Sequence, residues 1–171
     1  MVMPCAICAS LGKSCCKGYQ IYLTPGDISR ISDYLKVSDF YTVEPPVLTD
    51  IEPDYDPLWL PMIMSEDHQV RVLKRGADKQ CCLATDSGCL LPLDRRPLIC
   101  RLFPYDFKEN CILGIDQSCP ISKDRNWQTV LDRMDMTEAK ANLWRDLLYE
   151  EIRDKNSPAG SILSCLSCEN G

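Results

Sequence analysis

The chain has 171 residues, of which 45% are hydrophobic and 26% are charged, and its formal net charge is −6. This length suits a single domain over residues 1–171, and this composition excludes an intrinsically disordered chain. The negative charge argues against nucleic acid and anionic membranes as partners. No signal peptide and no apolar run of the ~20 residues that a spanning helix needs is evident, so we expect a cytoplasmic protein.

The first regular elements are predicted directly after the N-terminal cysteines. Residues 19–23 are rich in aromatic and branched side chains, which predicts a short strand. Thr24 can cap a helix that starts at Pro25, and Asp27 then lies at the positive end of the helix dipole. Apolar residues at helical spacing extend this helix to about residue 36.

Residues 44–61 contain five prolines and are predicted to form a surface loop rather than a regular helix. Tyr55 and Trp59 are side chains of the kind enriched at protein interfaces, so we expect this loop to help bind another protein. The alternative is that these aromatic side chains pack into the core. Strands are predicted over 69–75 and over 111–115, and Cys111 in the latter is expected to be buried.

The C-terminal part, residues 121–156, is predicted to be helical, and 157–171 is predicted to be a tail. The apolar residues of 121–156 recur at helical spacing, which indicates core packing rather than a cofactor site. These residues are Trp127, Val130, Leu131, Met134, Ala141, Trp144, Leu148 and Ile152. Thr137 is a candidate cap for the second of these helices. We expect a mainly helical α+β fold in which short strands wrap a metal centre and the C-terminal helices pack against it.

The twelve cysteines are the most unusual feature of the sequence. They are Cys5, Cys8, Cys15, Cys16, Cys81, Cys82, Cys89, Cys100, Cys111, Cys119, Cys165 and Cys168. Buried structural cysteines explain one or two of them, and a disulfide framework requires an oxidising compartment that nothing in the sequence indicates. Metal binding by cysteine thiolates is therefore the favoured interpretation.

The spacing of the cysteines narrows the kind of metal centre. Cys5 and Cys8 form a chelating pair, because two intervening residues let one turn aim both sulfurs at one metal. Neighbouring side chains diverge, so the adjacent pairs 15–16 and 81–82 either contain one structural member each or serve different metal atoms. This pattern favours a cluster, or two nearby sites, over one isolated ion.

Three arginines surround Cys100 in residues 95–104. Arginine near a thiolate lowers the pKa of the thiol, and it can donate hydrogen bonds that tune a metal cluster. The single histidine, His68, lies in an acidic stretch and is expected to be exposed rather than a ligand.

These motifs together resemble the YkgJ-type cysteine-cluster family of zinc- or iron-chelating domains. The resemblance covers roughly residues 5–120, and its features are Cys5-x2-Cys8, Cys15-Cys16, Leu23-Thr24 before Asp27-Ile28, Cys82-Leu83, Gly88-Cys89, Arg96-Pro97, Cys100-Arg101, Phe103-Pro104 and Cys119-Pro120. It implies metal ligands at Cys5, Cys8, Cys15, Cys16, Cys82, Cys89, Cys100 and Cys119. Cys81, Cys111, Cys165 and Cys168 lie outside the family pattern, and their roles stay open.

Three functions compete at this point. The first is an iron–sulfur protein, with a 4Fe–4S cluster favoured over zinc, in a redox or accessory role. The second is a zinc-stabilised module that binds another protein. The third is a protein-modifying enzyme or its subunit, because relatives of this family include flagellin lysine N-methylases. No glycine-rich loop or radical-SAM cysteine motif supports the third.

Overall fold

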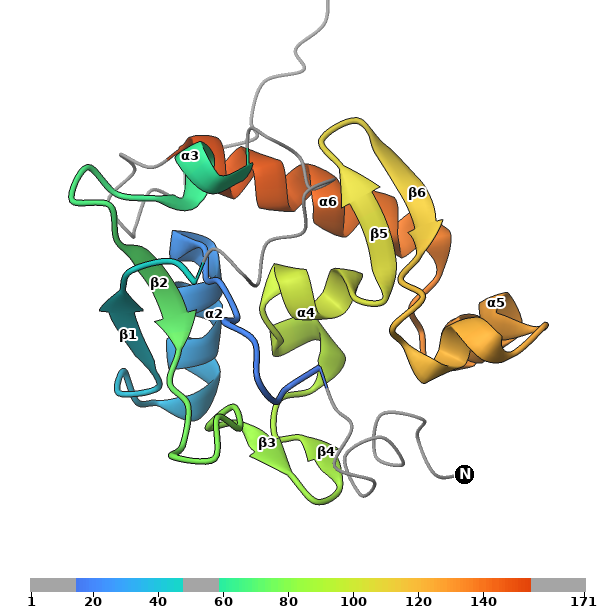
Figure 1. The fold of residues 1–171 in the computed structure, drawn as a ribbon, viewed down its shortest axis with the longest axis horizontal. Helices are drawn as coiled ribbons and strands as arrows, with labels where there is room; N and C mark the ends of the chain where they lie inside the picture. The colour runs from blue at the N-terminus through green and yellow to red at the C-terminus, as the bar shows by residue number, and fades with distance from the viewer. Residues whose placement is uncertain (1–14, 48–58, 155–171) are drawn as a thin grey trace, which may run out of the picture.

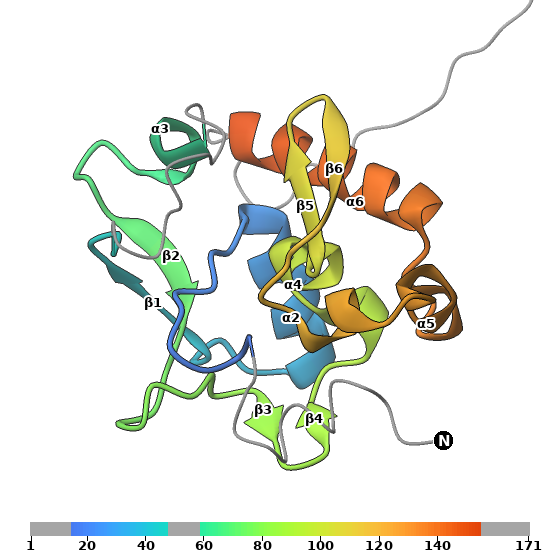
Figure 2. The ribbon, with the colours of Figure 1, turned by 45° about the vertical axis from the view of Figure 1, so that its right-hand side comes forward.

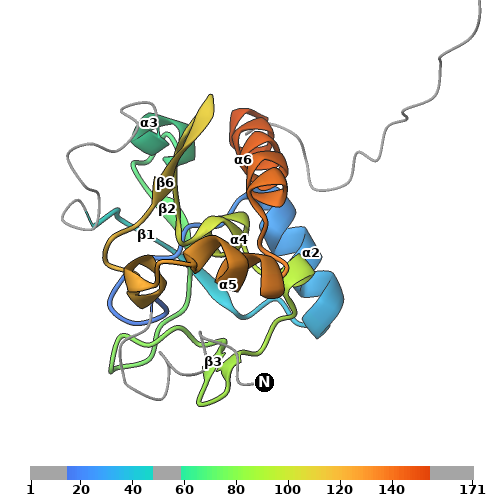
Figure 3. The same cartoon turned by 90° about the vertical axis from the view of Figure 1, so that its right-hand side faces the viewer.

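The computed structural model describes residues 15–47 and 59–154, and these form an α+β fold of short antiparallel strand pairs and helices (Figure 1). The coarse expectation of an α+β fold is thus confirmed. The views agree that helix α4 (Leu98–Leu102) lies at the centre, between α2 (Pro25–Leu35) and the C-terminal part of the chain (Figures 1 and 2). The short strands β3 (Ala84–Thr85) and β4 (Gly88–Cys89) lie at the end opposite α3 (Trp59–Ile63) and α6 (Glu138–Arg153) (Figures 1 and 3).

Helix α2 begins as its sequence predicts. The Thr24 hydroxyl accepts a hydrogen bond from Asp27 N at 2.9 Å, and the Asp27 carboxylate accepts one from Thr24 N at 3.2 Å. This reciprocal capping box satisfies two amide groups that the first turn leaves without a helical partner. The helix ends where Lys36 takes a left-handed conformation and donates its N–H to Ser32 O at 2.8 Å.

Strands β1 (Tyr41–Glu44) and β2 (Val70–Leu73) form an antiparallel pair. The predicted strand over 69–75 is therefore confirmed, whereas β1 was not predicted. The segment 19–23 runs along the other edge of β2, where Leu23 N donates to Arg71 O at 2.9 Å and Leu73 N donates to Ile21 O at 3.0 Å. Its pairing is limited to an isolated bridge, so the predicted strand forms only in part.

The prediction that 44–61 contains no regular helix is wrong at its end, because α3 starts at Trp59 and includes Pro61. Pro61 is the third residue of this helix. An N–H at that position has no helical acceptor, so its loss in proline costs no hydrogen bond.

A hairpin of β5 (Tyr105–Lys108) and β6 (Cys111–Ile115) confirms the predicted strand over 111–115. Cys111, however, is exposed rather than buried as predicted. It is the first residue of β6 and pairs with Lys108 next to the hairpin turn, so it lies away from the core. Among these strand residues, Tyr105 and Ile115 enter the core.

Helices α5 (Trp127–Arg133) and α6 form where the apolar stripes predict them. The short 3-10 helices η2 (Leu93–Arg95) and η3 (Pro120–Lys123) precede them in the chain. The Thr137 hydroxyl accepts a hydrogen bond from Lys140 N at 3.3 Å and so caps α6. The apolar stripes pack with α4 in one core, in which the buried stripe residues are Leu131, Met134, Ala141, Leu148 and Ile152. No helix of the described ranges is long and apolar enough to cross a membrane.

Trp59 is a core residue, which contradicts its prediction as a partner-binding anchor. It is 1% exposed, and its ring meets the rings of Tyr22, Phe107 and Tyr149 edge-on at centroid distances of 6.2, 6.4 and 6.2 Å. Such edge-to-face pairs add to the stabilisation from area burial. Tyr55, the other predicted anchor, lies outside the described residues.

A buried carboxylate joins α2 to α4. Asp27 is 1% exposed, and besides capping α2 it accepts a hydrogen bond from Leu98 N at 3.0 Å, at the start of α4. Arg30 donates to Asp27 at 2.7 Å and also pairs with Glu151 on α6. One acidic side chain therefore ties the N-terminal ends of two helices together and is linked through Arg30 to a third.

We expect Asp27→Ala to destabilise the fold by about 3 kcal/mol, because it leaves buried amide donors and Arg30 without their acceptor. Asp27→Asn should cost less, because the amide has nearly the same size and its oxygen keeps one acceptor for the donors around it. Urea unfolding of the variants measures the difference. Asp33→Ala, at an exposed position of the same helix, is the matched control and should shift stability by less than about 0.5 kcal/mol. Equal losses for Asp27→Ala and Asp33→Ala would contradict the role of the carboxylate.

Candidate metal centre

Cys16, Cys81, Cys89 and Cys100 meet in one place, and we call them the thiol cluster. Cys81 is buried within the second hydrophobic core, and the other three pack against that core. The electrostatic influence of Cys16, Cys81 and Cys89 reaches Cys100 and raises its pKa. Cysteines from three separate stretches of the chain therefore lie close together.

A short antiparallel ladder brings the first cysteine segment to the second. Gly18 N donates to Lys79 O at 3.1 Å, and Cys81 N donates to Cys16 O at 2.8 Å. An isolated bridge between Lys17 and Gln80 lies between these two bonds. The ladder places Cys16 directly beside Cys81, although more than sixty residues separate them in the sequence.

The remaining two members of the thiol cluster come from the β3–β4 hairpin and from α4. Cys89 lies on β4, where it pairs with Ala84 of β3. Cys100 lies in the middle of α4, whose start is held by the bond from Leu98 N to Asp27. The buried carboxylate of α2 thus helps to place a cysteine that is distant in sequence.

Burial dominates the electrostatics of the thiol cluster. It raises the pKa of Cys81 to about 12, and it raises the pKa of Cys100 well above the usual value for a thiol. Without a cation, these side chains therefore stay protonated at neutral pH. A bound metal ion would reverse this preference, because thiol ligands lose their protons on coordination.

Hydrogen-bond donors point at two of the sulfurs. Leu83 N donates to Cys81 Sγ at 3.4 Å. Cys89 receives hydrogen bonds from the Leu91 backbone and from the Arg96 side chain, and both lower its pKa against the larger effect of burial, which raises it. Donors of this kind stabilise thiolates and tune the properties of a metal centre that they surround.

The prediction that arginines lower the pKa of Cys100 is wrong. The pKa of Cys100 is raised, first by burial and then by the neighbouring cysteines. Arg96 acts on Cys89 instead, and Arg101 donates from Nε to Arg96 O at 2.7 Å. The reason is helical geometry, since successive residues of α4 point about 100° apart and Arg101 cannot share the direction of Cys100.

The structure separates the two members of each adjacent pair. Cys81 is buried, whereas Cys82 is exposed and donates from its sulfur to Phe40 O at 3.4 Å. Cys15 is likewise exposed and Cys16 is partly buried. The family resemblance implied Cys82 as a ligand and left the role of Cys81 open, so Cys81 was not predicted as a member of the thiol cluster. The alternation of buried and exposed residues along this stretch, with the apolar Leu83 two residues after Cys81, was the signal that could have identified it.

The structure describes the other predicted ligands only in part. Cys119 is buried at the start of η3, just after β6. Cys5 and Cys8 lie outside the described residues, as does the tail pair at 165 and 168. His68 is exposed, as predicted. Within residues 15–47 and 59–154, no group of three or more cysteine, histidine or acidic side chains has the arrangement of a formed metal-ion site.

We expect thiol labelling of the reduced, metal-free chain to separate Cys111 from Cys81. The thiolate is the reactive form, so a pKa of about 12 makes Cys81 react at least ~100-fold more slowly at neutral pH than the exposed Cys111. Timed alkylation followed by mass spectrometry measures both rates in one sample. The unfolded chain is the control, in which the two rates should converge. Equal rates in the folded chain would contradict the burial of Cys81.

Comparison with known proteins does not identify a family for this chain. The chain matches no family model, no curated protein and no solved structure. The resemblance to the YkgJ-type family therefore remains a prediction from the residues that carry it.

Proposed function

We propose that this chain is a metal-binding protein in which the four cysteines of the thiol cluster hold an iron–sulfur cluster. The observation that carries the proposal is the meeting of Cys16, Cys81, Cys89 and Cys100 from three separate segments, with backbone and arginine donors directed at their sulfurs. The centre serves a redox or accessory role, with another protein as its partner.

The surroundings of the thiol cluster suit a cluster of several irons. Each cysteine of a 4Fe–4S cluster binds its own iron atom, so the sulfurs lie around the cluster rather than converging on one point. A zinc ion instead requires every sulfur about 2.3 Å from a single centre. Here the thiols are spread over a ladder, a hairpin and a helix, with the apolar side chains of Ile21, Leu83 and Leu91 in the same core. Apolar surroundings and N–H donors to sulfur are features that set the reduction potential of such clusters.

Zinc is the second candidate. The chelating pair Cys5-x2-Cys8 favours it, because this spacing is common to zinc sites. With zinc, the protein becomes a module that binds a partner without redox chemistry. The lysine-methylase alternative rests on the resemblance alone, and the present proposal does not depend on it.

The metal also organises the fold in this proposal. Cys81 is a buried member of the second core, and the other three thiols pack against this core, which also contains apolar residues from 21–40, from β2 and from 83–91. Its ladder consists of a few backbone bonds, so metal coordination supplies the additional stability that holds the segments together.

Removing the metal is expected to cost several kcal/mol of folding free energy, because binding to a structural site is coupled to folding. Thermal unfolding of the metal-loaded and the chelator-treated chain under anaerobic conditions measures this loss. Loading should also weaken as the pH falls, since Cys81 and Cys100 must release protons to bind metal. An identical cooperative transition with and without metal would contradict the proposal.

Serine substitutions distinguish the thiol cluster from the ligand set expected from sequence. Cys81→Ser and Cys100→Ser should lose iron and acid-labile sulfide, because serine keeps the size of cysteine but is a poor ligand. Cys82→Ser and Cys111→Ser, at exposed positions, should retain both. Metal and sulfide analysis of anaerobically purified variants gives the result, and circular dichroism shows whether each variant folds.

Two outcomes would contradict the assignment. Loss of iron in Cys82→Ser with retention in Cys81→Ser would place the centre on the other face of the 81–82 pair. Stoichiometric zinc without iron or sulfide in anaerobically purified protein would show that the centre is a zinc site rather than an iron–sulfur cluster.

A further inference from the structure

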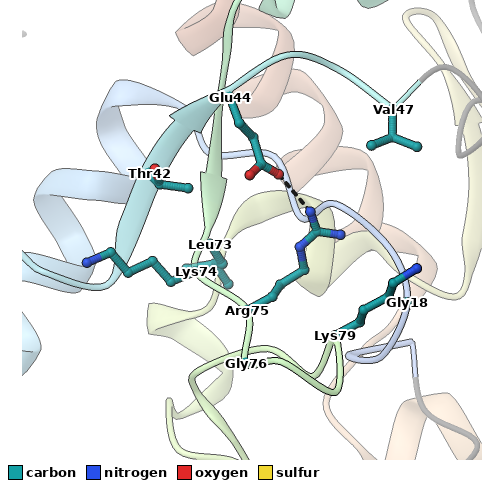
Figure 4. Close-up of a pocket in the computed structure, with 9 residues that line it drawn as sticks. All are labelled: Gly18, Thr42, Glu44, Val47, Leu73, Lys74, Arg75, Gly76 and Lys79. Atoms are coloured by element: carbon teal, nitrogen blue, oxygen red, sulfur yellow. Dashed lines mark hydrogen bonds and ion pairs between the residues drawn. The ribbon is translucent and has the colours of Figure 1, made fainter.

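A cavity of about 550 Å³ lies beside the ladder that carries Cys16 and Cys81. Its walls come from three parts of the chain: Gly18 after the first cysteines, Thr42 to Val47 at the end of β1, and Leu73 to Lys79 in the turn after β2 (Figure 4). Gly18 has a positive φ of 96°, and a Cβ added there would meet no atom within 4 Å. The wall at this glycine therefore faces open space.

The cavity has a defined charge pattern. Arg75 donates to Glu44 at 2.7 Å, and Gln20, which is 6% exposed, donates to the same carboxylate oxygen at 2.7 Å. Val47 N in turn donates to Gln20 Oε1 at 2.6 Å. The Glu44 carboxylate and the carbonyl end of Gln20 are thus engaged by neighbouring donors. Glu44 holds the guanidinium of Arg75 at the cavity wall.

The two lysines of the wall differ in direction. Lys74 pairs with Asp39, and Figure 4 shows its ammonium group pointing away from Arg75. Lys79 extends from the turn on the other side, near Gly18, and forms no ion pair with the carboxylates of the described residues (Figure 4). With Glu44 offsetting Arg75, and Asp39 offsetting Lys74, the ammonium of Lys79 leaves the cavity with a net charge of about +1, in a chain whose formal net charge is −6.

We propose that this cavity binds a carboxylate carried on a small apolar group. The planar guanidinium of Arg75 has donors beyond the one that Glu44 accepts, and carboxylates match its geometry. Lys79 supplies the uncompensated charge, and Val47, which is 36% exposed, supplies apolar surface for the body of the ligand. A phosphate dianion fits less well, because it exceeds the positive charge available and is repelled by Glu44.

The carboxylate can come from a small organic acid or from the C-terminus of a peptide, since both present the same group. The proposal does not rest on the metal centre, because none of the lining residues is a cysteine. Failure of the metal assignment therefore leaves it intact, and its own failure leaves the metal assignment intact.

Ligand-observed NMR with the full-length purified chain tests the proposal. Butyrate is expected to bind with millimolar affinity, whereas butyramide, which has the same shape without the charge, should not bind. Lys79→Gln should weaken butyrate binding roughly two- to fivefold, in line with the loss of one solvent-accessible ion pair. Lys79→Glu should abolish it. Lys108→Gln, which changes an exposed lysine on β5, is the matched control and should leave the affinity unchanged.

Competition experiments identify the molecule that carries the carboxylate. Competition with butyrate by a tripeptide with a free C-terminus, but not by its amidated form, supports a peptide C-terminus as the source. If neither tripeptide competes, a small organic acid is supported. The proposal is overturned if butyrate shows no binding, if butyramide binds equally well, if inorganic phosphate binds more tightly than butyrate, or if Lys79→Glu binds butyrate as well as the parent chain.

Discussion

The buried carboxylate of Asp27 is the contact on which the arrangement of the helices depends. It closes the capping box of α2 and accepts the amide of Leu98, which fixes the start of α4. Two residues further along α4, Cys100 enters the thiol cluster. A carboxylate with so little exposure is costly unless donors surround it, and here two backbone amides and Arg30 do so. The position of the proposed metal centre is therefore set partly by a residue that is not a ligand.

The two proposed sites share their supporting backbone. The bonds Gly18 N to Lys79 O and Cys81 N to Cys16 O belong to one ladder, with the carboxylate cavity at one end and the thiol cluster at the other. A ligand that contacts Lys79 and a metal that binds Cys81 would each restrain the same pair of segments. The turn after β2 thus lies between the proposed carboxylate site and the thiol cluster, a few residues from each along the chain.

Short sequence patterns predicted the helix caps and strands whose formation depends on residues close together in the chain. The capping residues of α2 and α6, the strand over 69–75 and the strand over 111–115 all follow from short patterns. The helices α3 and α4 were missed, because each is five residues long and starts near proline in a stretch whose composition suggests a loop. Such short helices gain their stability from tertiary packing rather than from intrinsic propensity.

The sequence by itself determined the α+β class, the chief caps, the helical stripes and the concentration of cysteines, because each depends on residue type and short-range spacing. The tertiary structure decided which cysteines meet, since a ladder between distant segments turned Cys81 inward and Cys82 outward. It also decided that Trp59 packs in the core and that Cys111 is exposed. Two adjacent identical residues do not by themselves say which of them is buried. The apolar Leu83 two residues after Cys81 is the one local indication, and the face that the rest of the fold covers makes the choice.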